Sequence, residues 1–269
     1  MPRIYSLAYL TSYTLTPPQA LRLASKLGYA QVGLRLLPNM AGAPQQFLIG
    51  KPEVLRETLA VQKDTGVELL DLEIIRINEG FDARAYLPLF EVGAALKAKA
   101  VLIAGDDTNP ARLSESYARL CELMLPFGLT ADLEFMPWTA VKDANTALCA
   151  IKAAGTPANA GILVDALHMG RSTTTLDDIR AIPRELLHYA QICDAQAGLN
   201  FSTEAMIRTA RCERLLAGEG TIDVKGIFAA LPQDLPVSVE VVHLERMAQH
   251  GQTEWARLCL ENAKNFLET

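Results

Sequence analysis

The chain lacks the cysteine pattern of a disulfide-bonded protein. Its five cysteines are odd in number and scattered, and no two of them form a Cys-x-x-Cys pair. Thiols spread in this way are typical of proteins that stay reduced inside the cell. We therefore predict a cytoplasmic protein in which the cysteines are buried or inert.

Long apolar runs and an excess of positive charge are also missing. The apolar runs are interrupted by Asp or Glu before they reach the roughly 20 residues of a membrane-spanning helix. The N-terminal segment MPRIYSLAYLTSYTLTPP has no apolar core ending in small residues, as a signal peptide would. The net charge is -6, without a basic stripe. We expect neither a membrane nor a nucleic-acid partner, and a small molecule as the substrate.

What the sequence does contain is a regular alternation of short apolar runs and amphipathic segments. The apolar runs predict strands at 4–10, 29–37, 67–75, 99–107, 128–136, 161–167, 187–195 and 237–242. The amphipathic segments predict helices at 17–28, 52–66, 83–98, 113–125 (with Ser114 as its N-cap), 142–155, 176–182 and 253–267.

Eight such alternations indicate a single-domain (β/α)8 TIM barrel over residues 1–269. Continuous apolar runs suit strands that are buried on both faces. An open, doubly wound sheet is the competing architecture, but it normally has a glycine-rich turn after the first strand, and TSYTLTPP stands there instead. Three long connections, 38–51, 196–221 and 243–252, follow strands and should lie at the carboxyl-terminal end of the barrel.

Four polar residues interrupt the last four apolar runs: Glu134, Asp165, Gln191 and Glu240. A carboxylate or amide in a buried strand is costly unless something compensates it. Each residue alone has an ordinary explanation, such as a lysine partner, a turn cap or a satisfied amide. On four consecutive strands, however, they could converge on one divalent cation. An all-oxygen ligand set favours Mn²⁺ or Mg²⁺, with Zn²⁺ a weaker fit.

The segments DLEF, VDALHMG, QICDA, LLAGEGTID and SVEVV resemble the xylose isomerase-like TIM-barrel superfamily of sugar isomerases, epimerases and dehydratases. The resemblance covers nearly the whole chain and implies that Glu134, Asp165, Gln191 and Glu240 hold the metal. His168, in the D-x-x-H segment, would contact the substrate. Many epimerases of the superfamily have histidine on strand seven, and the glutamine here resembles the hydroxypyruvate-isomerase-like members.

The resemblance also implies a mechanism and an activity. Glu134 and Glu240 would exchange a proton with a carbon next to a carbonyl, through an enediolate held at the metal. The leading hypothesis is therefore a metal-dependent isomerase or epimerase of a small sugar, sugar phosphate or hydroxy-carbonyl acid. The alternative is a dehydratase of the 3-dehydroshikimate or inosose type, because dehydration begins with the same proton abstraction.

Several further residues are candidates for substrate binding: His168, Arg35, Glu73, Asp194 and Arg214. An arginine makes a bidentate contact with a carboxylate or phosphate, although a solvated ion pair is the ordinary alternative. Trp138 could form an apolar wall of the pocket. His188 begins the seventh strand, at the opposite end of the barrel, and we assign it no chemistry.

Two other classes share the expected fold. Endonuclease IV needs a histidine-rich trinuclear zinc site and a positive face, whereas this chain has four histidines and is acidic. A non-catalytic sugar-binding barrel is the other class, and a metal response would argue against it. Barrels of the superfamily often assemble, so a homo-oligomer is also expected.

Overall fold

Eight parallel strands close into a barrel in the computed structural model, which describes residues 3–37 and 48–269. The strands follow one another in chain order, and β8 pairs with β1 to complete the barrel. Their bounds are β1 (Tyr5–Leu7), β2 (Gln31–Arg35), β3 (Glu68–Ile77), β4 (Ala100–Gly105), β5 (Thr130–Glu134), β6 (Ala160–Asp165), β7 (Ala190–Ile192) and β8 (Val237–Val239). The predicted (β/α)8 barrel is thereby confirmed.

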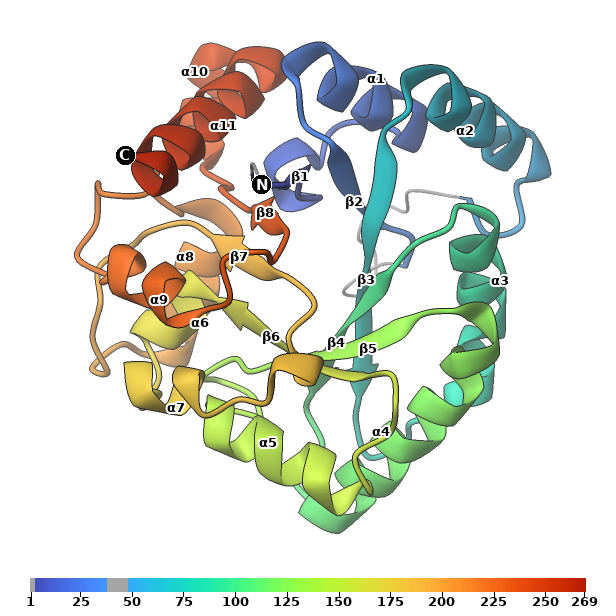
Figure 1. Cartoon of the computed structure of the whole chain (residues 1–269), viewed down its shortest axis with the longest axis vertical. Coiled ribbons are helices and arrows are strands. Elements are labelled where there is room, and N and C mark those ends of the chain that lie inside the picture. Colours follow the sequence, from blue (N-terminus) through green and yellow to red (C-terminus); the bar gives the residue numbers. More distant parts are fainter. Residues whose placement is uncertain (1–2, 38–47) are drawn as a thin grey trace.

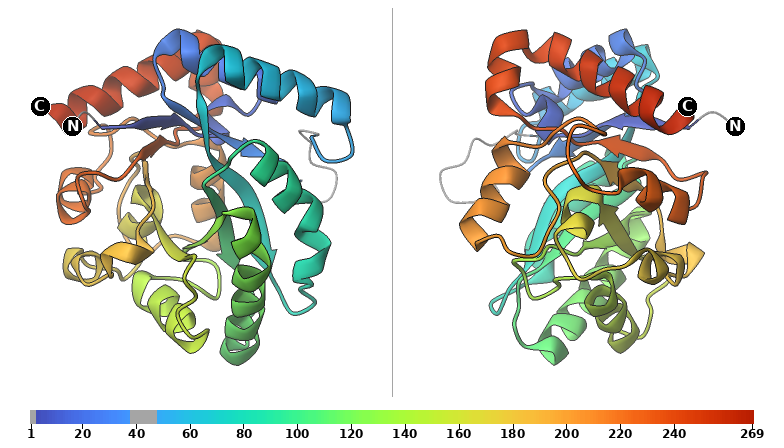
Figure 2. Two further views of the ribbon diagram at one scale, coloured as in Figure 1. Left: turned by 45° about the vertical axis from the view of Figure 1, so that its right-hand side comes forward. Right: turned by 90° about the vertical axis from the view of Figure 1, so that its left-hand side faces the viewer.

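Helices surround the barrel, as Figures 1 and 2 show. Their bounds are α1 (Pro17–Leu27), α2 (Pro52–Thr65), α3 (Leu87–Ala95), α4 (Pro110–Met124), α5 (Ala144–Ala153), α6 (Ala166–Gly170), α7 (Leu176–Arg180), α8 (Thr203–Cys212), α9 (Val224–Ala230), α10 (Leu244–His250) and α11 (Gln252–Glu268). Short 3-10 turns lie at Leu10–Ser12, Ala83–Tyr86, Leu125–Phe127 and Arg184–Leu186. No helix in the described ranges is long and apolar enough to cross a membrane.

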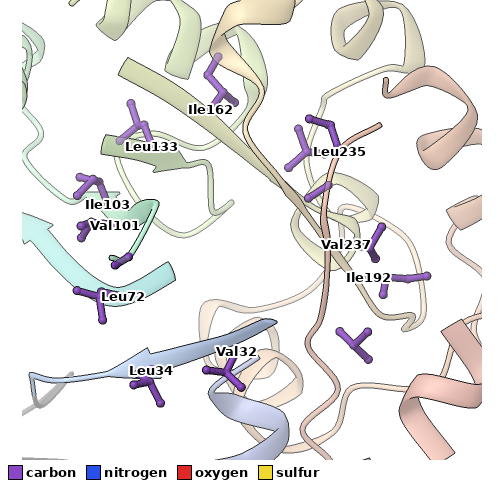
Figure 3. Close-up of a cluster of buried hydrophobic side chains, with 14 of the residues drawn as sticks. Val32, Leu34, Leu72, Val101, Ile103, Leu133, Ile162, Ile192, Leu235 and Val237 are labelled. Carbon is purple, nitrogen blue, oxygen red and sulfur yellow. The ribbon is translucent and has the colours of Figure 1, made fainter. Parts of the chain in front are cut away.

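Successive side chains of each strand point to opposite faces, and both faces are buried. Leu133 and Ile162 belong to the large hydrophobic cluster that also includes residues of the surrounding helices, part of which Figure 3 shows. Leu102 and Leu163 belong to a second, smaller cluster, on the alternate positions of their strands. On β5 the same alternation turns Glu134 away from Leu133 and towards the barrel interior.

One predicted helix boundary is wrong for a local reason, and two predicted connections contain helices. Helix α4 begins at Pro110, because the Asn109 side chain accepts the Ala111 and Arg112 backbone N–H groups; Ser114 is therefore not the N-cap. The predicted long connections 196–221 and 243–252 contain α8 and α10. The connection 38–51 lies largely outside the described residues.

At the amino-terminal end of the barrel, the partly exposed His188 pairs with the buried Asp132. The His188 Nδ1 atom lies 2.7 Å from the Asp132 carboxylate, and Gly161 leaves room for the contact, since a Cβ there would fall within 2.6 Å of both side chains. Burial alone would lower the pKa of the His188 imidazole. The hydrogen bond and charge of Asp132 outweigh burial and raise that pKa overall.

We expect His188→Gln to destabilise the protein in a pH-dependent way. A histidine with a raised folded-state pKa contributes its full stabilisation below about pH 6.5 and loses it as pH rises through the raised value. The free energy of unfolding should fall by about 1–2 kcal/mol at pH 6 and by less at pH 9. Urea denaturation of both proteins at both pH values measures this, and a loss that grew with pH would contradict it.

Candidate metal centre

The four predicted strand residues all lie at the carboxyl-terminal end of the barrel. Glu134 and Asp165 are the last residues of β5 and β6, and Gln191 lies in β7 beside Asp165. Glu240 directly follows β8, and its backbone N–H donates to the Ile192 carbonyl. All four side chains are buried. Because consecutive parallel strands end at the same edge, the barrel brings the four residues to the same end.

Glu134, Asp165 and His168 are close enough to bind one metal ion. Their ligand atoms all lie within 4.8 Å of one another, and His168 Nε2 is 3.5 Å from Glu134 Oε1. Asp165 caps α6 by accepting the His168 backbone N–H, and this hydrogen bond fixes the position of His168 relative to Asp165. Burial lowers the pKa of His168 to about 4, so its imidazole is neutral at pH 7 and can donate a lone pair.

A buried arginine, Arg214, connects two of the carboxylates. Its guanidinium lies 2.6 Å from Asp165 and 2.8 Å from Glu240, and its Nε donates to the Ala210 carbonyl. Burial opposes ionisation of Asp165, but Arg214 lowers its pKa overall. Burial raises the pKa of Glu240 to about 8, against the lowering effect of Arg214. Arg214 thus supplies positive charge where the carboxylates meet.

Glu134 lacks such an arginine contact. Burial raises its pKa well above the ordinary value, and the charges of Asp165 and Glu240 raise it further. A divalent cation would reverse this effect by favouring the ionised carboxylate. The charge state of Glu134 therefore depends on what binds beside it.

The amide of Gln191 supports the metal hypothesis independently of the charges. The side chain is fully buried, and neither its oxygen nor its nitrogen has a hydrogen-bond partner within the described ranges. A buried amide without a partner costs about 1–3 kcal/mol, so such groups normally bind something. An oxygen donor on the strand next to Asp165 suits a hard divalent cation. Glu134, Asp165 and His168 fit that group, while Arg214 already contacts Asp165 and Glu240.

The centre opens onto a cavity whose water-accessible interior measures about 60 Å³ and which is open to solvent. Trp138 forms one wall, as expected, and its ring meets the His168 ring edge-on at 4.9 Å. The lining residues are Leu10, Arg35, Glu73, Ile74, Arg76, Leu102, Glu134, Met136, Trp138, His168, Ala210, Arg211, Arg214 and Glu240.

The predicted substrate-binding residues divide into two groups. Arg35, Glu73, His168 and Arg214 line the cavity. Asp194 does not belong to this lining: its carboxylate accepts backbone N–H groups from Ala195, Gly218, Gly220 and Ile222. A Cβ at residue 220 would fall 2.3 Å from that carboxylate, so the glycine allows the loop to wrap around it.

Sequence reasoning missed two residues of this region. Arg211 lines the cavity from the last turn of α8, and no motif in the sequence distinguished it from the neighbouring arginines. Asp71 is fully buried two residues before Glu73, and neither of its oxygens has a partner in the described part of the chain. Burial raises its pKa well above the usual value, and the nearby Glu73 and Glu240 charges add to this.

A closed parallel barrel with a candidate acidic metal centre at its carboxyl-terminal end defines the class of protein. Residues 21–259 match the family model described as xylose isomerase-like TIM barrel. The chain belongs to this family, which confirms the resemblance seen in its sequence. No curated protein matches the chain in sequence.

Similar solved structures share the whole fold. The IolI protein with a binding zinc atom has 17% identity and a TM-score of 0.78, with 98% of each chain covered. The probable 3-DHS dehydratase AsbF from Bacillus anthracis has 15% identity and a TM-score of 0.78, with 99% of this chain and 100% of that one covered. D-allulose 3-epimerase from Methylomonas sp. has 15% identity and a TM-score of 0.70, with 99% of each chain covered. Identities this low show the fold alone.

Proposed function

We propose that the chain is a divalent-metal-dependent isomerase or epimerase of a small hydroxy-carbonyl compound. The observation that carries the proposal is the set of buried groups at one end of the barrel: Glu134, Asp165 and Glu240, the neutral His168 and the unpartnered Gln191. Arg214 compensates one of the three carboxylate charges, and the remaining negative charge favours a cation. The cavity beside them is open to solvent and is lined by Glu134, His168 and Glu240.

Glu134, Asp165, Gln191 and Glu240 would hold the cation, with His168 as a nitrogen donor within reach of the first two. The oxygen donors favour Mn²⁺ or Mg²⁺, while the imidazole and the zinc-containing structural neighbour keep Zn²⁺ as a candidate. When bound, such a cation supplies Lewis-acid stabilisation to the enediolate that forms after proton loss.

The acid and base of the proposed reaction are Glu134 and Glu240, which both line the cavity. Glu134 would take the proton from the carbon next to the carbonyl, and Glu240 would return a proton to the product. Arg214 would hold Glu240 in place through its 2.8 Å contact and would link it to Asp165. The Trp138 wall would limit the access of water to the reacting carbon.

A dehydratase is the second candidate, favoured by the four arginines that line the cavity: Arg35, Arg76, Arg211 and Arg214. They suit a hydroxy-carbonyl acid better than a neutral sugar, and AsbF is a probable dehydratase on the same fold. After the same proton abstraction, the enediolate would expel a β-hydroxyl group. A protonated Glu240 would give that group its proton, so that it leaves as water.

Metal removal and restoration in D₂O test both candidates. We expect protein treated with EDTA to be inactive, and Mn²⁺ or Mg²⁺ to restore exchange of the hydrogen next to the carbonyl in a panel of hydroxy-carbonyl compounds. Proton NMR would show deuterium gained without loss of water for an isomerase and a new alkene signal for a dehydratase. Absence of both metal binding in a thermal-shift series and hydrogen exchange would contradict the proposal.

A further inference from the structure

Three arginines line the same cavity as the candidate acid and base. Arg35 ends β2, Arg76 lies near the end of β3, and Arg211 lies in the last turn of α8. We call these three residues the arginine rim. They come from three different elements, so the fold itself brings three like charges to one opening. Such an arrangement is unfavourable unless negative charge balances it.

Two members of the rim have carboxylate partners in the protein. Arg35 lies 2.7 Å from Glu73 and stacks over the Tyr9 ring, with 4.5 Å from its guanidinium carbon to the ring centre. Its Nε is buried and has no partner among the described residues. Arg76 lies 2.8 Å from Asp106. These pairs hold the two guanidinium groups in place and leave them donors to spare.

Arg211 differs from both. Within residues 3–37 and 48–269 it has no carboxylate partner and no hydrogen bond. Burial lowers the pKa of its guanidinium, and the charges of Arg76 and Arg35 lower it further. By contrast, the surface residue Arg257 contacts both Glu254 and Glu261. A partly buried cation that faces two other cations and lines a cavity is suited to bind an anion.

We propose that the arginine rim binds an anionic group of the substrate, a carboxylate or a phosphate, with Arg211 as its principal contact. The inference rests on the proposed function, because it assumes that the hydroxy-carbonyl end of the same molecule faces Glu134. It adds the substrate class: a hydroxy-carbonyl acid or a sugar phosphate is bound, and a neutral sugar is discriminated against. The arginine fork matches either anion in a bidentate contact.

Three matched α-hydroxyketones test the rim: hydroxypyruvate carries a carboxylate, dihydroxyacetone phosphate a phosphate, and dihydroxyacetone neither. Calorimetry with the Mn²⁺-loaded protein should show at least one anion binding about tenfold or more tightly than dihydroxyacetone. The tighter of the two anions identifies the group. Arg211→Gln should remove that preference, and Arg211→Lys, which keeps the charge without the fork, should retain part of it.

Arg208→Gln is the matched control, because Arg208 lies on the same helix, is exposed and pairs with Glu213 outside the cavity. It should keep the full preference, and all variants should bind Mn²⁺ and dihydroxyacetone as the wild type does. The inference is overturned if the wild type binds neither anion more tightly than dihydroxyacetone, or if Arg211→Gln behaves like Arg208→Gln. Failure of the wild type to bind Mn²⁺ would instead contradict the proposed function. In that case the preference for an anion is measured with EDTA-treated protein.

Discussion

Replacing Glu134 with glutamine is expected to lower the rate of hydrogen exchange next to the substrate carbonyl by about 10³-fold. The amide cannot accept the proton, whereas its oxygen can still face the cation, as that of Gln191 would. Mn²⁺ affinity should therefore fall much less than the rate. The measurement is deuterium incorporation at saturating Mn²⁺, with Mn²⁺ binding followed by calorimetry.

Asp132→Asn is the matched control for this variant. Asp132 lies two residues earlier on β5, is fully buried, and pairs with His188 at the other end of the barrel. Its replacement should lower stability through the lost ion pair and leave the exchange rate of the folded protein unchanged. A Glu134→Gln variant that exchanged hydrogen as fast as Asp132→Asn would show that the base is another group.

The barrel could be predicted from the sequence because the strand signal is local. Each apolar run is short, buried on both faces and separated from the next by a helix, and these features survive in the linear order of residues. The same order places Glu134, Asp165, Gln191 and Glu240 at strand ends. Once the strands are parallel and consecutive, their ends must lie together, so the placement of these residues at one end of the barrel also follows from the sequence.

The contacts of Arg214 could not be predicted in this way. Its partner Asp165 is 49 residues away in the chain, and no local pattern connects the two. The expectation for Asp194 shows the opposite difficulty. Asp194 was expected to bind the substrate, but its carboxylate holds the loop at Gly218–Ile222 through backbone N–H groups. Whether a residue at a strand end lines the cavity or holds a loop depends on loops that are distant in the sequence and pack against it only in the folded protein.

The arrangement of Arg214 leads to the second large effect. Arg214→Met should lower the free energy of unfolding of EDTA-treated protein by about 3–5 kcal/mol at pH 8, because Asp165 and Glu240 lose their buried cation. Arg214 lowers the pKa of Asp165, so the stabilisation it provides is present above the ordinary carboxyl pKa and is lost as pH falls. The cost of the substitution should therefore shrink in acid, where the carboxylates are protonated.

Manganese should offset much of this loss, since a divalent cation can neutralise the same carboxylates. At about 100 times its dissociation constant, Mn²⁺ would restore about 2.7 kcal/mol. Arg257→Met is the control: Arg257 pairs with Glu254 and Glu261 on the surface, where such pairs contribute about 1 kcal/mol or less. Urea denaturation of both variants with EDTA and with Mn²⁺ measures the difference. One contrary result would be that Arg214→Met lowers the free energy of unfolding no more than Arg257→Met does. Another would be that Mn²⁺ raises the free energy of unfolding of neither variant. Either result would show that the carboxylates joined by Arg214 are not the groups that bind the cation.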